Sequence, residues 1–309
     1  MYKQILLLAL IGLSLQVKLI RKINFKNNCQ DTVWVGGFAV PLPPSTGWEM
    51  KPGSEFSMPV SGSSVAARFW ARTDCKWVGD KFQCSTGDCG TPMNNFGIEC
   101  KGITGQAPAT LVEFTLSTSG APDFYDMSNV DGYNIPVYFG PTPGSFRYVD
   151  NPDLGKFNCG SPSCNLDTSR CPRELQFKGA SGRTYCYSIC AAIYNNEQVQ
   201  NNKDILGPIA SDPMKRDLVC CACGEGTGGC TDPSSHFCCS PLDPRSGIGG
   251  RCYVQNWPKP SSNFDRYDKV FKDQCGDAYS WQFDDMQSTY QCMDADYDVV
   301  FCPKKASEW

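Results

Sequence analysis

Three carboxylates and one arginine are the residues of this chain best suited to carbohydrate chemistry. Glu113, Asp126 and Asp131 lie within a short span, and Arg68 falls on a segment with strand periodicity. Several carboxylates in one groove would accept hydrogen bonds from the hydroxyls of a polysaccharide, and the arginine would limit their mutual repulsion. Glu113 with Asp126 is also the natural pair for glycoside hydrolysis, in which one acid donates a proton and the other acts as nucleophile or base.

The same residues also have a structural interpretation. Asp126 and Asp131 fall in a turn-rich segment, where an aspartate often caps or bonds its own backbone. Hydrolysis would require a raised pKa on one carboxyl group and a defined separation of the two, and a sequence contains neither. A binding groove, a hydrogen-bond cluster and a hydrolytic pair therefore stand as three open interpretations.

Other catalytic and metal chemistries have less support. His236 is the only histidine, so a Ser/His/Asp or Cys/His device would have to be built around it, and residues 234–239 contain no nucleophile elbow. A zinc site could combine His236 with nearby cysteines at metal-like spacing, namely Cys220, Cys221, Cys223 and Cys230. Disulfides are favoured over zinc in an oxidising compartment, so we expect no metal and no cofactor.

Composition indicates a secreted, disulfide-rich protein that does not bind nucleic acid. The chain has 20 cysteines among 309 residues, an even number that suits an oxidising compartment. A net charge of −4 argues against a basic face for phosphates. Residues 1–14, with cleavage as late as about residue 21, are typical of a signal peptide, because a short apolar run follows one positive charge. We expect no transmembrane segment after it.

The elements that must position the candidate residues are mostly predicted strands. In residues 64–72, Arg68 and Arg72 alternate with apolar residues, which places both arginines on one face. In residues 109–116, Val112 and Phe114 share the face opposite Glu113. Further strands are expected at 23–27 and 32–38, as an opening hairpin, and at 56–60, 134–139 and 297–303.

Two cysteine-dense regions interrupt these strands. Residues 73–108 predict a small disulfide-held loop, and residues 159–275 predict a larger subdomain whose order depends on its cross-links. Within the larger region, 188–200 has helical character and about 199–235 is a polar, Gly-rich insertion.

Several motifs in a fixed order resemble the thaumatin-like family, the osmotin and pathogenesis-related group-5 proteins. The likeness extends over roughly residues 22–303. Its motifs are ARFWARTDC at 67–75, CSTGDC at 84–89, LVEFTL at 111–116, DFYDMSNVDGYNIP at 123–136, Cys171-Pro172, CGDAYS at 275–280 and FCP at 301–303.

This resemblance implies an all-β fold, a flattened antiparallel β-sandwich of ten or eleven strands with two disulfide-rich loop subdomains. The core would come from residues 22–72, 109–158 and 276–303. The subdomains would be 73–108 and 159–275, the latter with the insertion at about 199–235.

The resemblance also implies an acidic cleft between the sandwich and the large subdomain. Arg68, Glu113, Asp126 and Asp131 would line it together with one of the adjacent Asp284 and Asp285, of which we favour Asp285. Aromatic side chains could offer flat faces to sugar rings, the candidates being Tyr133, Tyr138, Phe139 and Trp281.

The family commonly has sixteen cysteines, so four are surplus here. The implied pairs are Cys29–Cys302, Cys75–Cys84, Cys89–Cys100, Cys159–Cys292, Cys164–Cys275, Cys171–Cys186, Cys190–Cys238 and Cys239–Cys252. The surplus Cys220, Cys221, Cys223 and Cys230 would then pair among themselves within the insertion. An alternative register uses Cys220 and Cys221 as the family's adjacent pair.

The function implied by the resemblance is binding of a β-glucan-type polysaccharide or a cell-wall surface, in a defence or antifungal role. One alternative is a weak endo-β-1,3-glucanase using Glu113 and Asp126. Another is a secreted structural or enzyme-inhibitor protein whose cleft is incidental. We expect a monomer.

Overall fold

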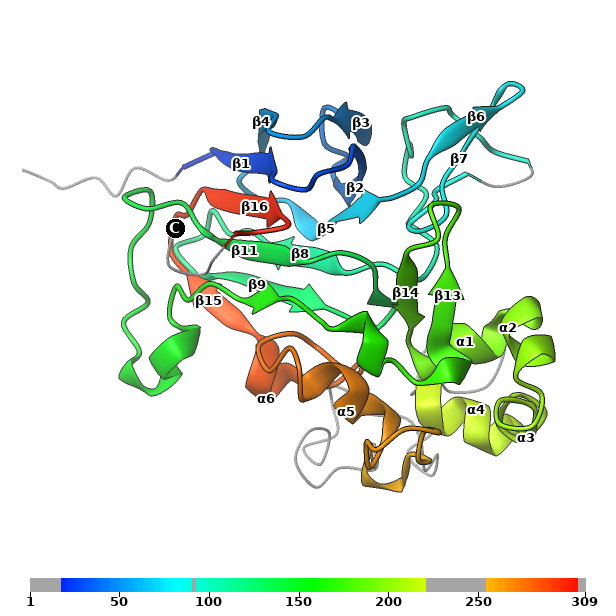
Figure 1. Ribbon diagram of the computed structural model, residues 1–309. Coiled ribbons are helices and arrows are strands. Elements are labelled where there is room, and N and C mark those ends of the chain that lie inside the picture. The colour runs from blue at the N-terminus through cyan, green and yellow to red at the C-terminus, as the bar shows by residue number, and fades with distance from the viewer. Residues whose placement is uncertain (1–17, 91–92, 221–253, 305–309) are drawn as a thin grey trace, which may run out of the picture.

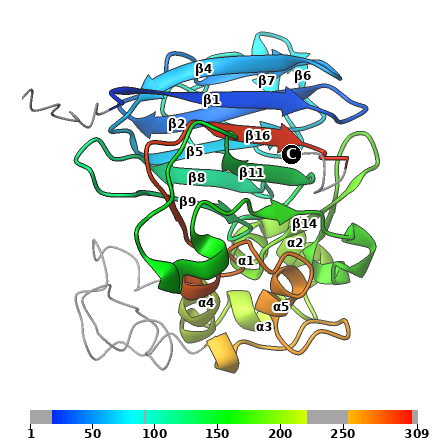
Figure 2. The ribbon, with the colours of Figure 1, turned by 90° about the vertical axis from the view of Figure 1, so that its left-hand side faces the viewer.

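Two β-sheets form the core of the protein in a computed structural model, which describes residues 18–90, 93–220 and 254–304. Figure 2 shows the strands of both sheets layered above the helices. In spatial order, the five-stranded sheet consists of β12 (Ser163–Cys164), β11 (Val137–Pro141), β16 (Tyr297–Phe301), β1 (Ile20–Asn27) and β4 (Glu55–Ser61). The six-stranded sheet consists of β15 (Tyr290–Cys292), β9 (Asp123–Ser128), β8 (Leu111–Thr115), β5 (Val65–Arg72), β2 (Val33–Val40) and β3 (Gly47–Met50). The fold is thus the predicted flattened sandwich.

Two expectations about strand pairing were wrong. β1 and β2 do not form a hairpin, because β1 pairs with β4 and β16 whereas β2 pairs with β3 and β5 in the other sheet. Both edges of each strand are therefore already hydrogen-bonded to other partners. The sandwich is also not wholly antiparallel, since β1 runs parallel to β16.

An aromatic cluster fills the space between the sheets. Phe25, Phe139 and Tyr297 come from the five-stranded sheet, and Phe69 and Phe114 come from the other; all five are at most 3% exposed. The rings of Phe114 and Tyr297 stack across the interface with centroids 6.1 Å apart. This packing follows from the period-two pattern of β5 and β8, which sends Phe69 and Phe114 inward and leaves Arg68 and Glu113 on the opposite face.

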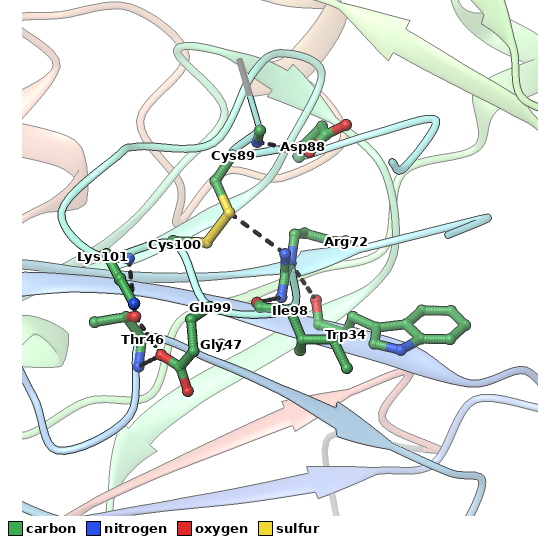
Figure 3. Close-up of a disulfide and its surroundings, with 12 residues drawn as sticks. Trp34, Thr46, Gly47, Arg72, Asp88, Cys89, Ile98, Glu99, Cys100 and Lys101 are labelled. Carbon is green, nitrogen blue, oxygen red and sulfur yellow. Dashed lines mark hydrogen bonds between the residues drawn. A yellow bond between two sulfur atoms is a disulfide. The ribbon is translucent and has the colours of Figure 1, made fainter. Parts of the chain in front are cut away.

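The small loop region after β5 is anchored by a buried arginine. It contains the hairpin β6 (Lys76–Val78) and β7 (Lys81–Gln83). Arg72 donates to the carbonyls of Trp34, Val35 and Ile98 and contacts the sulfur of Cys89, next to the Cys89–Cys100 disulfide (Figure 3). Burial lowers the pKa of Arg72 to about 10 even though Asp88 and Glu99 raise it.

The large subdomain contains more helix than its sequence predicted. Beside the small sheet of β10 (Gly132–Tyr133), β14 (Thr184–Tyr187) and β13 (Gln176–Lys178), the helices lie together below the sandwich (Figure 1). Those of the large subdomain are α1 (Ile189–Tyr194), α2 (Asn196–Asn201), α3 (Gly207–Ala210), α4 (Pro213–Cys220) and α5 (Tyr267–Lys272), and α6 (Asp285–Ser288) follows it in the chain. The segment 188–200 is helical as expected. The predicted insertion is helical over much of its length up to Cys220, and the rest of it lies outside the described residues.

The structure forms six of the implied disulfides and replaces a seventh. The six are Cys29–Cys302, Cys75–Cys84, Cys89–Cys100, Cys159–Cys292, Cys164–Cys275 and Cys171–Cys186. Cys190 pairs with Cys220, so the Cys190–Cys238 pairing and the assignment of Cys220 to the surplus were wrong. The reason is that α4 packs against α1 and brings the two sulfurs together, as in the alternative register. The remaining cysteine predictions concern Cys221, Cys223, Cys230, Cys238, Cys239 and Cys252, which lie outside the described residues.

Two further sequence expectations concern membranes and the leader. Within residues 18–90, 93–220 and 254–304, no helix combines the length and apolar character that a membrane span requires. The predicted signal peptide, residues 1–14, lies outside the described residues.

Candidate functional site: an acidic groove on the six-stranded sheet

Three of the predicted site residues are direct neighbours across three adjacent strands. Arg68 on β5 lies opposite Glu113 on β8, and Glu113 lies opposite Asp126 on β9. Residues directly opposite one another in an antiparallel pair have Cβ atoms roughly 4.5–5.5 Å apart on one face of the sheet. The pairing register of the three strands therefore places a cation and two carboxylates side by side, and no loop is needed to bring them together.

These side chains line a groove of about 500 Å³ on the outer face of the sheet. Asp131 joins from the turn between β9 and β10, and Asp285 joins from the first residue of α6. The groove thus contains Arg68, Glu113, Asp126, Asp131 and Asp285, the set that the resemblance implied with Asp285 favoured.

The wall that carries Asp285 is attached to β9 by the backbone of Tyr279. The amide of Tyr279 donates to the carbonyl of Met127 at 2.8 Å, and its carbonyl accepts from the amide of Asn129 at 2.9 Å. The Tyr279 hydroxyl then donates to Asp285 Oδ1 at 2.9 Å. Asp285 is therefore held toward the groove by a segment that is itself bonded to the sheet.

Asp284 does not line the groove and is a structural residue. Its carboxylate is buried and accepts hydrogen bonds from the backbone amide and the hydroxyl of Ser280 at 3.1 and 3.0 Å. Lys272 Nζ lies 2.9 Å from the same carboxylate and also donates to Ser288 Oγ and the carbonyl of Ala278. This ion pair joins α5 to the start of α6 and turns Asp284 away from solvent.

Burial and crowding raise the pKa of all three carboxyl groups on the floor of the groove. The pKa of Asp126 is raised well above its usual value, first by desolvation and then by the charges of Glu113 and Asp285. The pKa of Glu113 is raised by desolvation and by Asp131, while Arg68 opposes the shift. Desolvation also raises the pKa of Asp131, again against Arg68. The groove therefore disfavours the charged form of each of these carboxyl groups, and Arg68 opposes the shift at Glu113 and Asp131.

Two polar atoms in the groove lack a partner among the described residues. Arg68 Nε and Gln282 Oε1 are both buried, and both residues line the groove. The Arg68 guanidinium lies over the ring of Phe38, 5.4 Å from its centroid. One free donor and one free acceptor beside a row of carboxyl groups suit a ligand that both donates and accepts hydrogen bonds, as sugar hydroxyls do.

The aromatic residues expected at the groove are elsewhere. Tyr133, Tyr138 and Phe139 are buried, and partly buried Trp281 packs against the core, so none of the four lines the groove. Phe124 lines it instead and is 45% exposed. Phe124 lies two residues before Asp126 on β9, so the same strand alternation that placed Asp126 could have identified it. No comparable sequence signal pointed to Gln282, which depends on the path of the 279–285 segment.

In the described part of the chain, no group of three or more His, Cys, Asp or Glu side chains has an arrangement that could hold a metal ion. The possible zinc cluster around His236 has most of its members among residues 221–253, which lie outside that part.

Comparison with known proteins identifies the family. The Thaumatin family profile matches residues 27–204 and 215–303. The chain belongs to the thaumatin family. It is 34% identical over 290 residues to "Thaumatin-like protein 1" of Pyrus pyrifolia, covering 91% of each chain. It is 30% identical over 284 residues to "Pathogenesis-related protein 5" of Arabidopsis thaliana, covering 91% of this chain and 89% of the other.

Among solved structures, a laminaripentaose-producing beta-1,3-glucanase in complex with laminaritetraose has a TM-score of 0.49 and 13% identity, covering 94% of this chain and all of the other. The thaumatin-like xylanase inhibitor TLXI has a TM-score of 0.33 and 22% identity, covering 47% of this chain and 91% of the other. Neither likeness is close enough to carry an argument about substrate or activity.

Proposed function

We propose that this thaumatin-family protein is secreted and binds β-glucan-type polysaccharide in its acidic groove, in a defence-type role. The observation that carries the proposal is the row Arg68, Glu113, Asp126 across β5, β8 and β9 at the floor of the groove. Exposed Phe124 on the same face of β9 supplies an apolar surface for a sugar ring. The cysteine count and a relative named as a pathogenesis-related protein support the location and the role.

A neutral glucan suits this groove better than a charged polymer. Among the described lining residues, four carboxyl groups face one arginine, so an anionic polymer would be repelled when they are ionised. Neutral hydroxyls can donate to carboxylates and also satisfy Arg68 Nε and Gln282 Oε1.

The test is a pull-down with insoluble β-1,3-glucan. Glu113→Gln and Asp126→Asn keep the size of each side chain and remove its charge, and we expect both to weaken retention on the glucan. Glu55→Gln is the matched control, because Glu55 is an exposed carboxylate on the other sheet, paired with Lys26. Failure of the unmodified protein to bind glucan would exclude the proposal, as would equal losses in all three variants.

Hydrolysis is the second candidate, and one observation favours it. Glu113 and Asp126 are directly opposite each other, and the pKa of each is raised, as a general acid requires. The pull-down supernatant decides between the two candidates. Reducing sugar that disappears in both variants would establish a glucanase, whereas retention without reducing sugar leaves a binding protein.

A further inference from the structure

A second groove, of about 480 Å³, lies in the large subdomain and is lined by arginines and no carboxylates among the described residues. One side consists of two short 3₁₀ turns, η2 (Thr168–Arg170) and η3 (Arg173–Leu175), and the other is the segment 261–264. Among its described lining residues, the charged side chains are both arginines and none is a carboxylate. The lining comprises Ser169, Arg170, Cys171, Pro172, Arg173, Ser261, Ser262, Asn263 and Phe264. We call it the basic groove.

A buried carboxylate holds the two sides of the basic groove together. Glu174 is fully buried and accepts hydrogen bonds from the amide of Ser261 at 2.8 Å, from its hydroxyl, and from the hydroxyl of Tyr267 at 2.9 Å. The Cys171–Cys186 disulfide joins the same turn to β14. Because Glu174 faces inward and accepts hydrogen bonds from three donors on Ser261 and Tyr267, it fixes the shape of the groove.

The two arginines differ in how they are held. The guanidinium of Arg170 lies over the ring of Phe264, 5.0 Å from its centroid, and both residues line the groove. Arg173 pairs with Asp204, and both side chains are more than half exposed. An exposed ion pair contributes only about 0–1 kcal/mol, so a ligand oxyanion can compete for Arg173.

The other charged residues near the basic groove interact with partners of their own. The carboxylate of Asp167 accepts from the amide of Ser169 at 3.0 Å, and its pKa is lowered by that serine and by Arg170. Lys259 and Asp265 pair with each other at 3.5 Å. Ser262 also lines the groove, and its Oγ is buried with no hydrogen-bond partner among the described residues.

We propose that the basic groove binds an oxyanion carried on a sugar, either the carboxylate of a uronate or the phosphate of a sugar phosphate. A guanidinium presents parallel N–H donors that match both oxyanions, and such charge-assisted hydrogen bonds are roughly twice as strong as neutral ones. Three exposed hydroxyl and amide side chains of the lining, Ser169, Ser261 and Asn263, can bond the ring hydroxyls. The site is separate from the acidic groove and does not depend on the function proposed for it.

The test is calorimetric titration of the full chain at low ionic strength with trigalacturonate, glucose 6-phosphate and, as the neutral control, glucose. We expect at least one anionic sugar to bind and glucose not to bind. Binding of trigalacturonate alone would identify the carboxylate source, and binding of glucose 6-phosphate alone the phosphate source. Binding of neither would overturn the proposal.

Variants locate the binding. Arg170→Gln with Arg173→Gln should weaken the affinity by about tenfold or more, because two charge-assisted contacts are removed. Lys178→Gln with Lys203→Gln is the matched control, since both lysines are exposed in the same subdomain and outside the groove. If the control weakens binding as much as the arginine variant, the attraction is general and the site is excluded. Glucan retention should be unchanged in both double variants, which separates this result from the test of the acidic groove.

Discussion

The acidic groove and the basic groove have similar volumes but are assembled in different ways. In the acidic groove, Arg68, Glu113 and Asp126 occupy opposed positions on three strands in the interior of one sheet. In the basic groove, Arg170 and Arg173 lie on two short 3₁₀ turns, held by the Cys171–Cys186 disulfide and by Glu174. The register of the strands determines the geometry of the acidic groove, whereas a disulfide and a buried carboxylate hold the shape of the basic groove.

This difference predicts which changes should disrupt the binding geometry of each groove. A site built into a ladder persists as long as the sandwich persists, because its geometry is that of the sheet hydrogen bonds. A site on short turns should lose its shape when one local anchor is removed, since such segments open locally at a lower free energy than the strands of a core sheet. The predictions that follow test this contrast, beginning with the largest expected effect.

Removing the Cys29–Cys302 disulfide should cost the most stability. The bond joins the ends of β1 and β16 with a sequence separation of 273, and loop entropy for that span gives about 5–6 kcal/mol. Cys29→Ala with Cys302→Ala should therefore lower the free energy of unfolding, measured in urea, by up to that amount. It should also weaken ligand binding at both grooves. A loss of one groove with the other unaffected would contradict the view that the sandwich supports both.

Removing the cation of the buried Lys272–Asp284 pair should affect the wall of the acidic groove. Lys272→Met leaves Asp284 buried without a counter-charge, which typically costs about 3–5 kcal/mol. Adding Asp284→Asn should recover part of that loss, and a double-mutant cycle measures how much. Glucan retention should fall in the single variant, because the segment bearing Asp285 is loosened, while binding at the basic groove should not change.

Removing the Cys171–Cys186 disulfide should act mainly on the basic groove. Its sequence separation of 15 predicts a loss of about 3 kcal/mol. For Cys171→Ala with Cys186→Ala we expect anionic-sugar binding to disappear in calorimetry while glucan pull-down continues. Anionic-sugar binding that persists in this variant would show that packing alone holds the turns in place.

Asp126→Asn should stabilise the protein at neutral pH, which is the smallest effect. The pKa values of Glu113, Asp126 and Asp131 are raised on folding, so above the usual carboxyl range the folded state holds more protons than the unfolded state. Stability then falls as pH rises through that window. The amide removes one contributor, and a gain of ~1 kcal/mol would raise the melting midpoint by about 2–4 °C.

The control for this effect is the pH profile itself. Calorimetric scans from mildly acidic to neutral pH should show a shallower decline for Asp126→Asn than for the unmodified protein. Glu55→Gln, on an exposed carboxylate of the other sheet, should leave the slope unchanged. Parallel profiles for the unmodified protein and Asp126→Asn would mean that Asp126 titrates normally.

Predictions of which face a side chain occupies on a strand were more accurate than predictions of which strands or cysteines pair with each other. The faces of β5 and β8 came out as expected, with Phe69 and Phe114 inward and Arg68 and Glu113 outward. The opening hairpin was wrong, because β1 and β2 are close in sequence yet bond to strands in different sheets. Cys190 was assigned to Cys238 because helix α4, which brings Cys220 to it, lay in a segment taken for a polar insertion.

The sequence by itself indicated the family through its motifs, and the family resemblance implied the sandwich. The sequence also supplied the candidate site residues Arg68, Glu113, Asp126 and Asp131, because motifs and a period of two are local properties of a chain. The resemblance offered the adjacent Asp284 and Asp285 as alternatives and favoured Asp285, and the tertiary structure places Asp285 in the groove and pairs Asp284 with Lys272. Tertiary structure alone brought Arg170 and Arg173 beside Phe264, which lies some ninety residues further along the chain. The physical reason is that burial and charge pairing depend on distances in space, which adjacency in sequence does not specify.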